Sequence, residues 1–349
     1  LRHKFSAKQQ LAADLDWVGY KIQGDQAFQN ERKGNDAYIE SYTGALPSTI
    51  RILSFKADHS ITLRESLLLE TGIKVSNTKT DNDAAYFVNN GAGWEEDLAK
   101  TNHFLYAENI RAAYASIEKK SEQWSMQLGL RYEYTSYTGE QLGNSLLKDS
   151  AFSNRYGSLF PNFLATYRID SLNELSLSFG KRIDRPPYQK LNPFVSILNK
   201  YTYQAGNPLM KPQYTHNLEL THRFKDFLST GLSYSITTDY FSQIFYTDSI
   251  GTVYYTEGNL GKRQVLGLSV GFNKAILPAW SVNTQVDIQH KKMKGFVWKE
   301  MTSTNTQMSI SLSNQLRFKK VWVAELSGYY ITSSQSDIQE VVEPTGQLS

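Results

Sequence analysis

One motif in the chain could belong to a catalytic serine. Gly267, Ser269 and Gly271 match G-x-S-x-G, the pattern of a nucleophile elbow, in which a sharp strand-to-helix turn exposes the serine. Residues 266–272 instead alternate between apolar and polar, as in a β-strand, and no helical pattern follows. We therefore expect Ser269 on the polar face of a strand, and we predict no catalytic residue and no enzyme.

The residue types that bind metals are scattered along the sequence. Cysteine is absent, and the six histidines form neither an H-x-H pair nor an H-x-x-x-H set. Acidic residues gather on both sides of Trp94, but their spacing fits no EF-hand, so we expect a solvated loop. This acidic group consists of Asp81, Asp83, Glu95, Glu96 and Asp97. The sequence thus predicts neither a metal site nor a cofactor.

A stretch rich in proline and tyrosine is a candidate for ligand recognition. Between Arg182 and Tyr214, prolines alternate with aromatic residues, so the segment is stiffened rather than a floppy linker. Its side chains Tyr188, Tyr201 and Tyr203 suit the faces of a sugar or a chelate, and loops often carry recognition. The alternative is a folded cap that supports the rim of the fold.

Charged side chains near the same loops are further candidates. Arg131 and Glu133 lie on the polar face of one alternating segment, and Arg182 with Asp184 lies on that of another. We expect these four residues, together with Trp94 in the acidic loop, to contact a solute. The alternative is that the charges pair with one another along the wall.

The composition points to β-structure. The chain has 349 residues, of which 13% are aromatic, and Gly and Asn recur at short intervals. Its mean hydropathy is −0.46, and no run of apolar residues is long enough for a membrane-spanning helix. The formal net charge is +3 without a basic, aromatic-interleaved stripe, so nucleic acid is not an expected partner. The first residues, LRHKFSAKQQ, hold no secretion signal.

Alternation with period two is clearest from Gln123 to Tyr137. One face of this segment carries Trp124, Met126, Leu128, Leu130, Tyr132 and Tyr134, and the other face is polar. The apolar face extends over roughly 20–25 Å, which matches the apolar band of an outer membrane. A sandwich strand gives the same alternation but is usually only about five or six residues long.

Similar long segments recur between two kinds of connection. Short turns are predicted at 57–60, 119–122, 170–173, 225–227, 275–279 and 319–320, and longer polar connections at 24–42, 80–101, 138–154, 185–213, 247–251 and 295–303. Short turns at one end and long loops at the other are typical of outer-membrane barrels, and counting gives about 13 strands where complete barrels have an even number. Trp124, Trp280, Trp322 and Phe224 fall beside short turns, as one aromatic girdle would.

The sequence resembles the barrel of TonB-dependent receptors of the outer-membrane β-barrel family. The resemblance rests on NHFLYAENIRAAYASIEKKSEQWSMQLGLRYEYT at 102–135, LFPNFLATYRID at 159–170, SFGKRIDRPPYQKLNPF at 178–194 and GNPLMKPQYTHNLELTHRF at 206–224. It implies an N-terminal plug that contacts TonB, a barrel of about 22 strands, and import of a scarce nutrient such as an iron chelate, cobalamin or a glycan.

The expected fold is all-β: residues 1–349 form part of one antiparallel transmembrane β-barrel, with the plug and the closing strands absent from the sequence. The expected location is the bacterial outer membrane, where lipid contacts the wall, TonB acts through the plug region and a small nutrient binds. Two alternatives remain. An outer-membrane barrel hydrolase needs a nucleophile beside His216 or His222, and a soluble β-rich adhesin or binding module needs a second sheet over the apolar face.

Overall fold

The fold is dominated by one large, curved and almost wholly antiparallel sheet. The computed structural model describes residues 1–35, 37–199, 201–247, 249, 251–296, 299–318, 321–335 and 340–349. Among these residues, thirteen strands have ten or more residues, in agreement with the predicted count. They are β2 (Gln9–Ile22), β5 (Ser48–Arg64), β6 (Leu67–Asn89), β8 (Asn102–Lys120), β9 (Trp124–Leu142), β10 (Ser150–Arg168), β11 (Asn173–Asp184), β14 (Gln213–Phe224), β15 (Leu228–Thr247), β16 (Val253–Leu277), β17 (Trp280–Phe296), β18 (Glu300–Phe318) and β19 (Trp322–Ile331).

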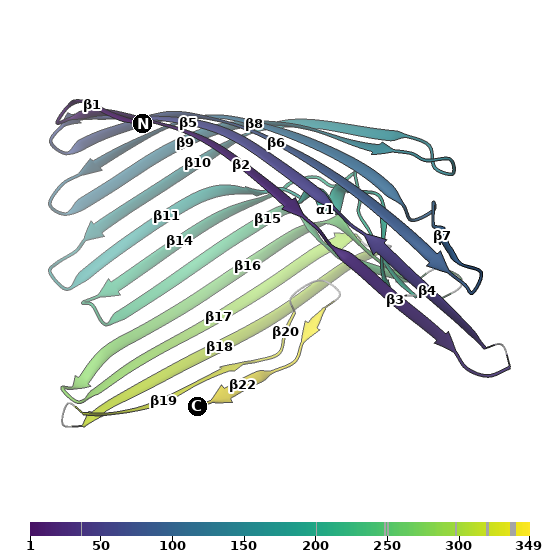
Figure 1. Cartoon of the computed structure of the whole chain (residues 1–349). Helices are drawn as coiled ribbons and strands as arrows, with labels where there is room; N and C mark the ends of the chain where they lie inside the picture. Colours follow the sequence, from purple (N-terminus) through teal and green to yellow (C-terminus); the bar gives the residue numbers. More distant parts are fainter. Residues whose placement is uncertain are drawn as a thin grey trace.

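The remaining elements are short and lie at the edges or in the connections. They are β1 (Arg2–Ser6), β3 (Asp25–Arg32), β4 (Tyr38–Ala45), β7 (Trp94–Glu96), α1 (Tyr188–Leu191), β12 (Val195–Asn199), β13 (Thr202–Ala205), β20 (Ser334–Gln335), β21 (Val341–Val342) and β22 (Thr345–Leu348). Each long strand pairs antiparallel with the next long strand, from β2 to β19, while β1 and β22 pair at the two ends of the series. In Figure 1 the sheet curves as an open trough, with tight turns at one end and long connections at the other.

The two faces of the sheet differ because cross-strand partners point the same way. On one face Leu220, Leu232, Leu268, Ile288 and Met308 form an unbroken apolar row across five strands. One register step away, the other face carries the polar row of Ser269, Asp287 and Ser309. Residues on this apolar face are about half exposed: Leu232 and Leu268 of the row keep 50% and 40% of their accessible surface, and Leu128 on β9 keeps 55%. In the described part of the chain no second sheet covers this face, contrary to the soluble alternative.

An aromatic girdle marks the tight-turn end of the apolar face. The ring of Trp124 stacks on Tyr167 at a centroid distance of 4.2 Å. On the neighbouring hairpin, Phe227 makes edge contacts with Phe224 and Phe272 at 5.5 and 5.7 Å. Rings of this kind prefer the boundary between hydrocarbon and water. Among the described residues, no helix is long and apolar enough to cross a membrane.

Several predicted connections are correct and one is wrong. Turns occur as expected between β8 and β9, β10 and β11, β14 and β15, and β16 and β17. The turn predicted at 57–60 is wrong, because β5 runs without a break to Arg64 and the chain reverses at Glu65 and Ser66. Asp58, His59 and Ser60 have a turn-like composition, but they pair in the ladder with both β2 and β6. The turn predicted at 319–320 lies outside the described residues.

The long connections contain more strand than predicted. The loop predicted at 24–42 is largely the hairpin of β3 and β4, while β6 continues through the predicted loop to Asn89. Strands β9 and β10 likewise extend into the loop predicted at 138–154. Beyond the lipid both faces of a strand meet water, so alternation fades while backbone pairing continues. The connections predicted at 247–251 and 295–303 lie partly outside the described residues.

The turn between β10 and β11 depends on Asp170. Its Oδ1 accepts hydrogen bonds from the backbone N–H groups of Leu172 at 2.7 Å and Asn173 at 2.8 Å. The N–H of Leu172, followed by the side chain of Asn173, holds the pKa of the Asp170 carboxyl below its ordinary value. This is a capped turn in which the charged carboxylate is the favoured form.

We expect Asp170→Ala to lower the urea midpoint of the full-length protein modestly at pH 7. A group whose pKa is depressed in the folded state stabilises the fold above its unfolded pKa, and the contribution is lost as pH falls through the folded value. The difference between the variant and the wild type should therefore shrink as pH falls below about 4, the ordinary pKa of an aspartate. Urea titrations at pH 7 and pH 3 measure it, and a difference that is the same at both values would contradict the assigned cause.

Candidate functional site

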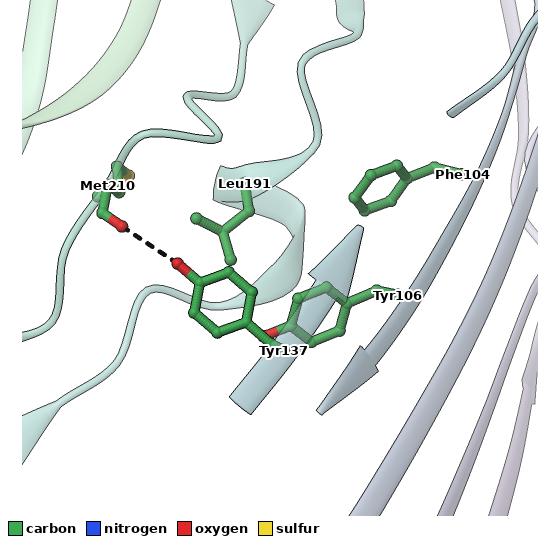
Figure 2. Packing of buried hydrophobic residues seen from close by; sticks show 5 residues of the cluster. All are labelled: Phe104, Tyr106, Tyr137, Leu191 and Met210. Atoms are coloured by element: carbon green, nitrogen blue, oxygen red, sulfur yellow. Dashed lines mark hydrogen bonds between the residues drawn. The ribbon is translucent and has the colours of Figure 1, made fainter. Parts of the chain in front are cut away.

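The connection between β11 and β14, residues 185–212, folds over the polar face of the sheet; we call it the strap. Figure 2 shows Leu191 and Met210 of the strap near Phe104, Tyr106 and Tyr137 on β8 and β9. All five residues are buried, with Phe104 at 0% exposure and Leu191 and Met210 at 1%. The hydroxyl of Tyr137 donates a hydrogen bond to the backbone oxygen of Met210 at 3.5 Å. The strap is therefore packed against the sheet at the end with the long connections, which we call the mouth.

The strap is shaped by its own backbone contacts. The N–H of Asn207 donates to the oxygen of Lys190 at 2.6 Å, which joins its two limbs. Gly206 sits where they meet, and a Cβ atom there would lie 2.1 Å from the backbone oxygen of Asn192. No residue with a side chain fits without moving the backbone, so this glycine is required by close approach.

Residues 190–211 of the strap are also connected to β16. Lys190 forms an ion pair with Glu257, whose backbone oxygen accepts from Asn207 Nδ2 at 3.1 Å. Asn259 bonds the strap twice, because its Oδ1 accepts from the N–H of Lys211 at 2.7 Å and its Nδ2 donates to the oxygen of Lys211 at 2.9 Å. In addition, β13 pairs in parallel with the start of β16. These contacts fix the strap across the polar face.

At the start of the strap, directly after β11, an ion network connects the strap to β9. The guanidinium of Arg185 contacts Glu133 at 2.5 Å, and Arg131 contacts the other oxygen of Glu133, also at 2.5 Å. Arg185 also donates to Thr135 Oγ1 at 3.1 Å. Burial is the largest single influence and lowers the pKa of Arg185, but the hydrogen bond to Glu133 and the surrounding negative charges together hold the pKa above its ordinary value. The network therefore keeps Arg185 charged and paired.

The network continues along the wall. Arg131 lies over the ring of Tyr114 at 5.2 Å, and Tyr114 donates its hydroxyl hydrogen to Asp58 on β5. Asp58 in turn pairs with Lys56 at 2.6 Å. The predicted residues Arg131 and Glu133 thus come together, and they do so in the wall-pairing arrangement that was the alternative to solute contact.

A cavity of about 230 Å³ lies between the strap and the ends of β6 and β8; we call it the amide pocket. It is lined by Leu46, Asn82, Ala84, Tyr86, Asn102, Tyr188, Gln189, Asn192, Phe194, Gln204 and Gly206. Asn82 and Ala84 alternate on one face of β6, and Asn102 pairs opposite Ala84. Tyr86 is 3% exposed and lies against Gly44, where an added Cβ would come within 2.7 Å of its ring.

The aromatic candidates are placed in different surroundings. Tyr188 lines the amide pocket, stacks on Tyr106 at 6.2 Å and lies 3.4 Å from Ser48 Oγ. Tyr203 packs against Ala84 and Tyr86 beside the pocket. Trp94 on β7 and Tyr201 at the tip of the strap hairpin are 54% and 64% exposed and do not line it. Their part in ligand binding remains a prediction.

Of the charged candidates, Arg182 and Asp184 stay apart from the ion network. Both side chains are exposed on one face of β11, and Asp184 accepts a hydrogen bond from Gln213 Nε2 at 3.0 Å. Arg185 and the five carboxamides of the amide pocket were not predicted from the sequence. A local signal existed for Arg185, because it directly precedes Pro186 and Pro187, which end a strand and redirect the chain.

The catalytic motif and the histidines do not form a reactive site. Ser269 lies within β16, paired with Gly231 and Asp287 in regular ladders, without a strand-to-helix turn. His222 contacts Asn173 at 3.1 Å, and His216 lies beside Phe179. Within the described ranges, no three His, Cys, Asp or Glu side chains are grouped so that they could hold a metal ion.

Comparison with known families identifies this architecture. The model of the outer membrane protein beta-barrel family matches residues 3–349. The chain belongs to this family. Its sheet is therefore a wall of the bacterial outer membrane, and the exposed apolar face is the face that meets lipid. A search of curated proteins gave no match.

Solved structures share the fold of this outer membrane protein beta-barrel. The ferric-catecholate import receptor Fiu from E. coli K12 superposes with a TM-score of 0.64 at 12% identity, over 99% of this chain and 55% of Fiu. The siderophore receptor PiuA from Acinetobacter baumannii gives 0.64 at 12%, over 99% and 56%. The ferric yersiniabactin uptake receptor FyuA from Yersinia pestis gives 0.60 at 13%, over 97% and 53%. The chain thus spans a little over half the length of these receptors, and its predicted likeness to a receptor barrel is confirmed for the fold.

Proposed function

We propose that residues 1–349 are part of the barrel of an outer-membrane receptor that imports a scarce nutrient. The observation that supports the proposal is the strap, which is fixed across the polar face and leaves a partly open pocket at the mouth. A sheet with an apolar outer face supplies the conduit, and the strap with the neighbouring loops captures the solute. The plug and TonB belong to this proposal as the gate and its energy source.

The same arrangement argues for binding rather than covalent chemistry. The groups at the mouth are rings, carboxamides and paired ions, and the serine of the hydrolase motif is held within a ladder. Solute identity would be decided by a few polar groups in a concave site. The nutrient classes consistent with the family resemblance are iron chelates, cobalamin and glycans.

We expect the intact protein to support energised uptake of one of these classes. Cells with and without the gene would be given labelled ferric citrate, cyanocobalamin or a mixture of neutral oligosaccharides. One probe should accumulate at least tenfold more in cells that contain the protein, and an uncoupler of the inner membrane should abolish the difference. Equal accumulation of all three probes in both strains would reject the import function.

A further inference from the structure

We infer that the amide pocket binds one ring of a neutral saccharide. This inference rests on the proposed function and narrows its substrate class. The cavity of about 230 Å³ is smaller than the ~300–1,000 Å³ of sites for drug-sized ligands. It therefore suits a single small unit of a longer solute, while the remainder lies in the open mouth.

The first argument is charge. No residue that lines the pocket is acidic or basic. The nearest strap cations are already paired, Arg185 with Glu133 and Lys190 with Glu257. Carboxylates, catecholates and phosphates are recognised by arginine and lysine through charge-assisted hydrogen bonds. A pocket without such groups selects an uncharged ligand.

The second argument is the hydrogen-bonding inventory. Five carboxamides line the pocket: Asn82, Asn102, Gln189, Asn192 and Gln204. Each carboxamide offers both donors and an acceptor, and each sugar hydroxyl likewise donates and accepts. Only Asn102 of the five is buried, so the others can turn their polar atoms toward a ligand. This set therefore matches a ligand covered with hydroxyl groups.

The third argument is an unpartnered acceptor. Asn102 is 6% exposed, and its Nδ2 donates to the backbone oxygen of Lys100 at 3.3 Å. Its buried Oδ1 has no hydrogen-bond partner in the described structure. An acceptor left in this state destabilises the empty site. This atom is enclosed by protein, and a rotation of the Asn102 side chain toward the pocket would let a ligand hydroxyl supply the missing donor.

The fourth argument is the aromatic lining. Tyr86, Tyr188 and Phe194 contribute rings to the pocket, and their apolar faces suit the C–H face of a pyranose. Tyr86 is held by Gly44, and Tyr188 by Tyr106 and Ser48. The rings are therefore placed before the ligand arrives, which reduces the ordering cost of binding.

The test is calorimetric binding to the full-length protein in detergent. The probes are maltohexaose, mannohexaose, xylohexaose, an oligogalacturonate and ferric citrate. We expect one neutral hexasaccharide to bind and the two charged probes not to compete. Asn102→Asp and Gln204→Glu should each weaken binding at least tenfold, because a carboxylate lacks the carboxamide donors. Gln29→Glu, which changes an exposed carboxamide on β3, should leave binding unchanged.

Two further readouts separate the possible failures. Trypsin digestion shows whether the strap of each variant remains docked, and the exposed Gln189→Ala replaces Asn102→Asp if the latter does not fold. If the wild type and Asn102→Asp import a charged solute equally well, the proposed saccharide specificity of the pocket is rejected, but the import function is not. If neither the wild type nor the variants bind any of the neutral probes, the pocket is a hydrated structural cavity and not a saccharide site.

Discussion

Replacing Leu128 with arginine is expected to destabilise the full-length protein in a bilayer by about 2–4 kcal/mol, the cost of a cation on the lipid face near the midplane. Leu128 lies halfway along the apolar face of β9, between Ile117 and Phe163 on the neighbouring strands, and is 55% exposed. The surrounding row offers no partner for a guanidinium. Reversible unfolding in lipid vesicles, followed by the gel shift between folded and unfolded protein, measures the loss.

The adjacent residue provides the matched control. Gln127 is on the opposite face, where its register partner on β8 is Glu118. Gln127→Arg should therefore change the free energy of unfolding by no more than about 0.5 kcal/mol. Equal losses for the two variants would show that this face does not meet lipid, and would restore a soluble fold as the better interpretation.

Replacing Arg185 with methionine is expected to release the strap. The substitution removes one of two cations from Glu133, whose side chain is only 13% exposed. Breaking one partner of a largely buried ion pair typically costs about 3 kcal/mol, because a charge is left poorly compensated. If this free energy is lost from the docking of the strap, the fraction of molecules with an undocked strap rises about 100-fold. Trypsin cleavage after Lys190 in the full-length protein should accelerate to a similar extent.

A double substitution separates charge from packing. In Glu133→Gln with Arg185→Met the uncompensated carboxylate is gone, so cleavage should be slower than in Arg185→Met alone. Arg182→Met, on the exposed face of β11, serves as the control and should leave the cleavage rate unchanged. If Arg185→Met and Arg182→Met were cleaved equally slowly, the ion network would have no part in holding the strap.

The spanning strands could be predicted because lipid on one side imposes strict alternation. The segment from Trp124 to Tyr134 follows it without exception, and the structure places this segment in β9. Strand ends could not be predicted in the same way, because β6 continues past the lipid through Asp81 and Asp83, where both faces are wet. The false turn at 57–60 had a related cause. The segment has a turn-like composition, but the carboxylate of Asp58 is satisfied by Lys56 and Tyr114 on the polar face.

The site was only partly visible in the sequence. Arg131 and Glu133 stand two residues apart on one strand, so their pairing follows from the period of the strand. The amide pocket assembles residues separated by more than 100 positions, as the contact between Ser48 and Tyr188 illustrates. Alternation gives no information on where a loop returns to the wall. Pro186 and Pro187 indicated that the strap was stiff, but not that it docked on β8.

The way the strap is fastened also sets an order of assembly. Its contacts reach back to Ser48 on β5 and forward to Glu257 and Asn259 on β16. Contacts between residues so distant in the chain form slowly, since a long segment must be ordered before they provide any stabilisation. The strap therefore docks only after the hairpins on both sides have formed. During biogenesis the mouth therefore stays open until β16 is in place.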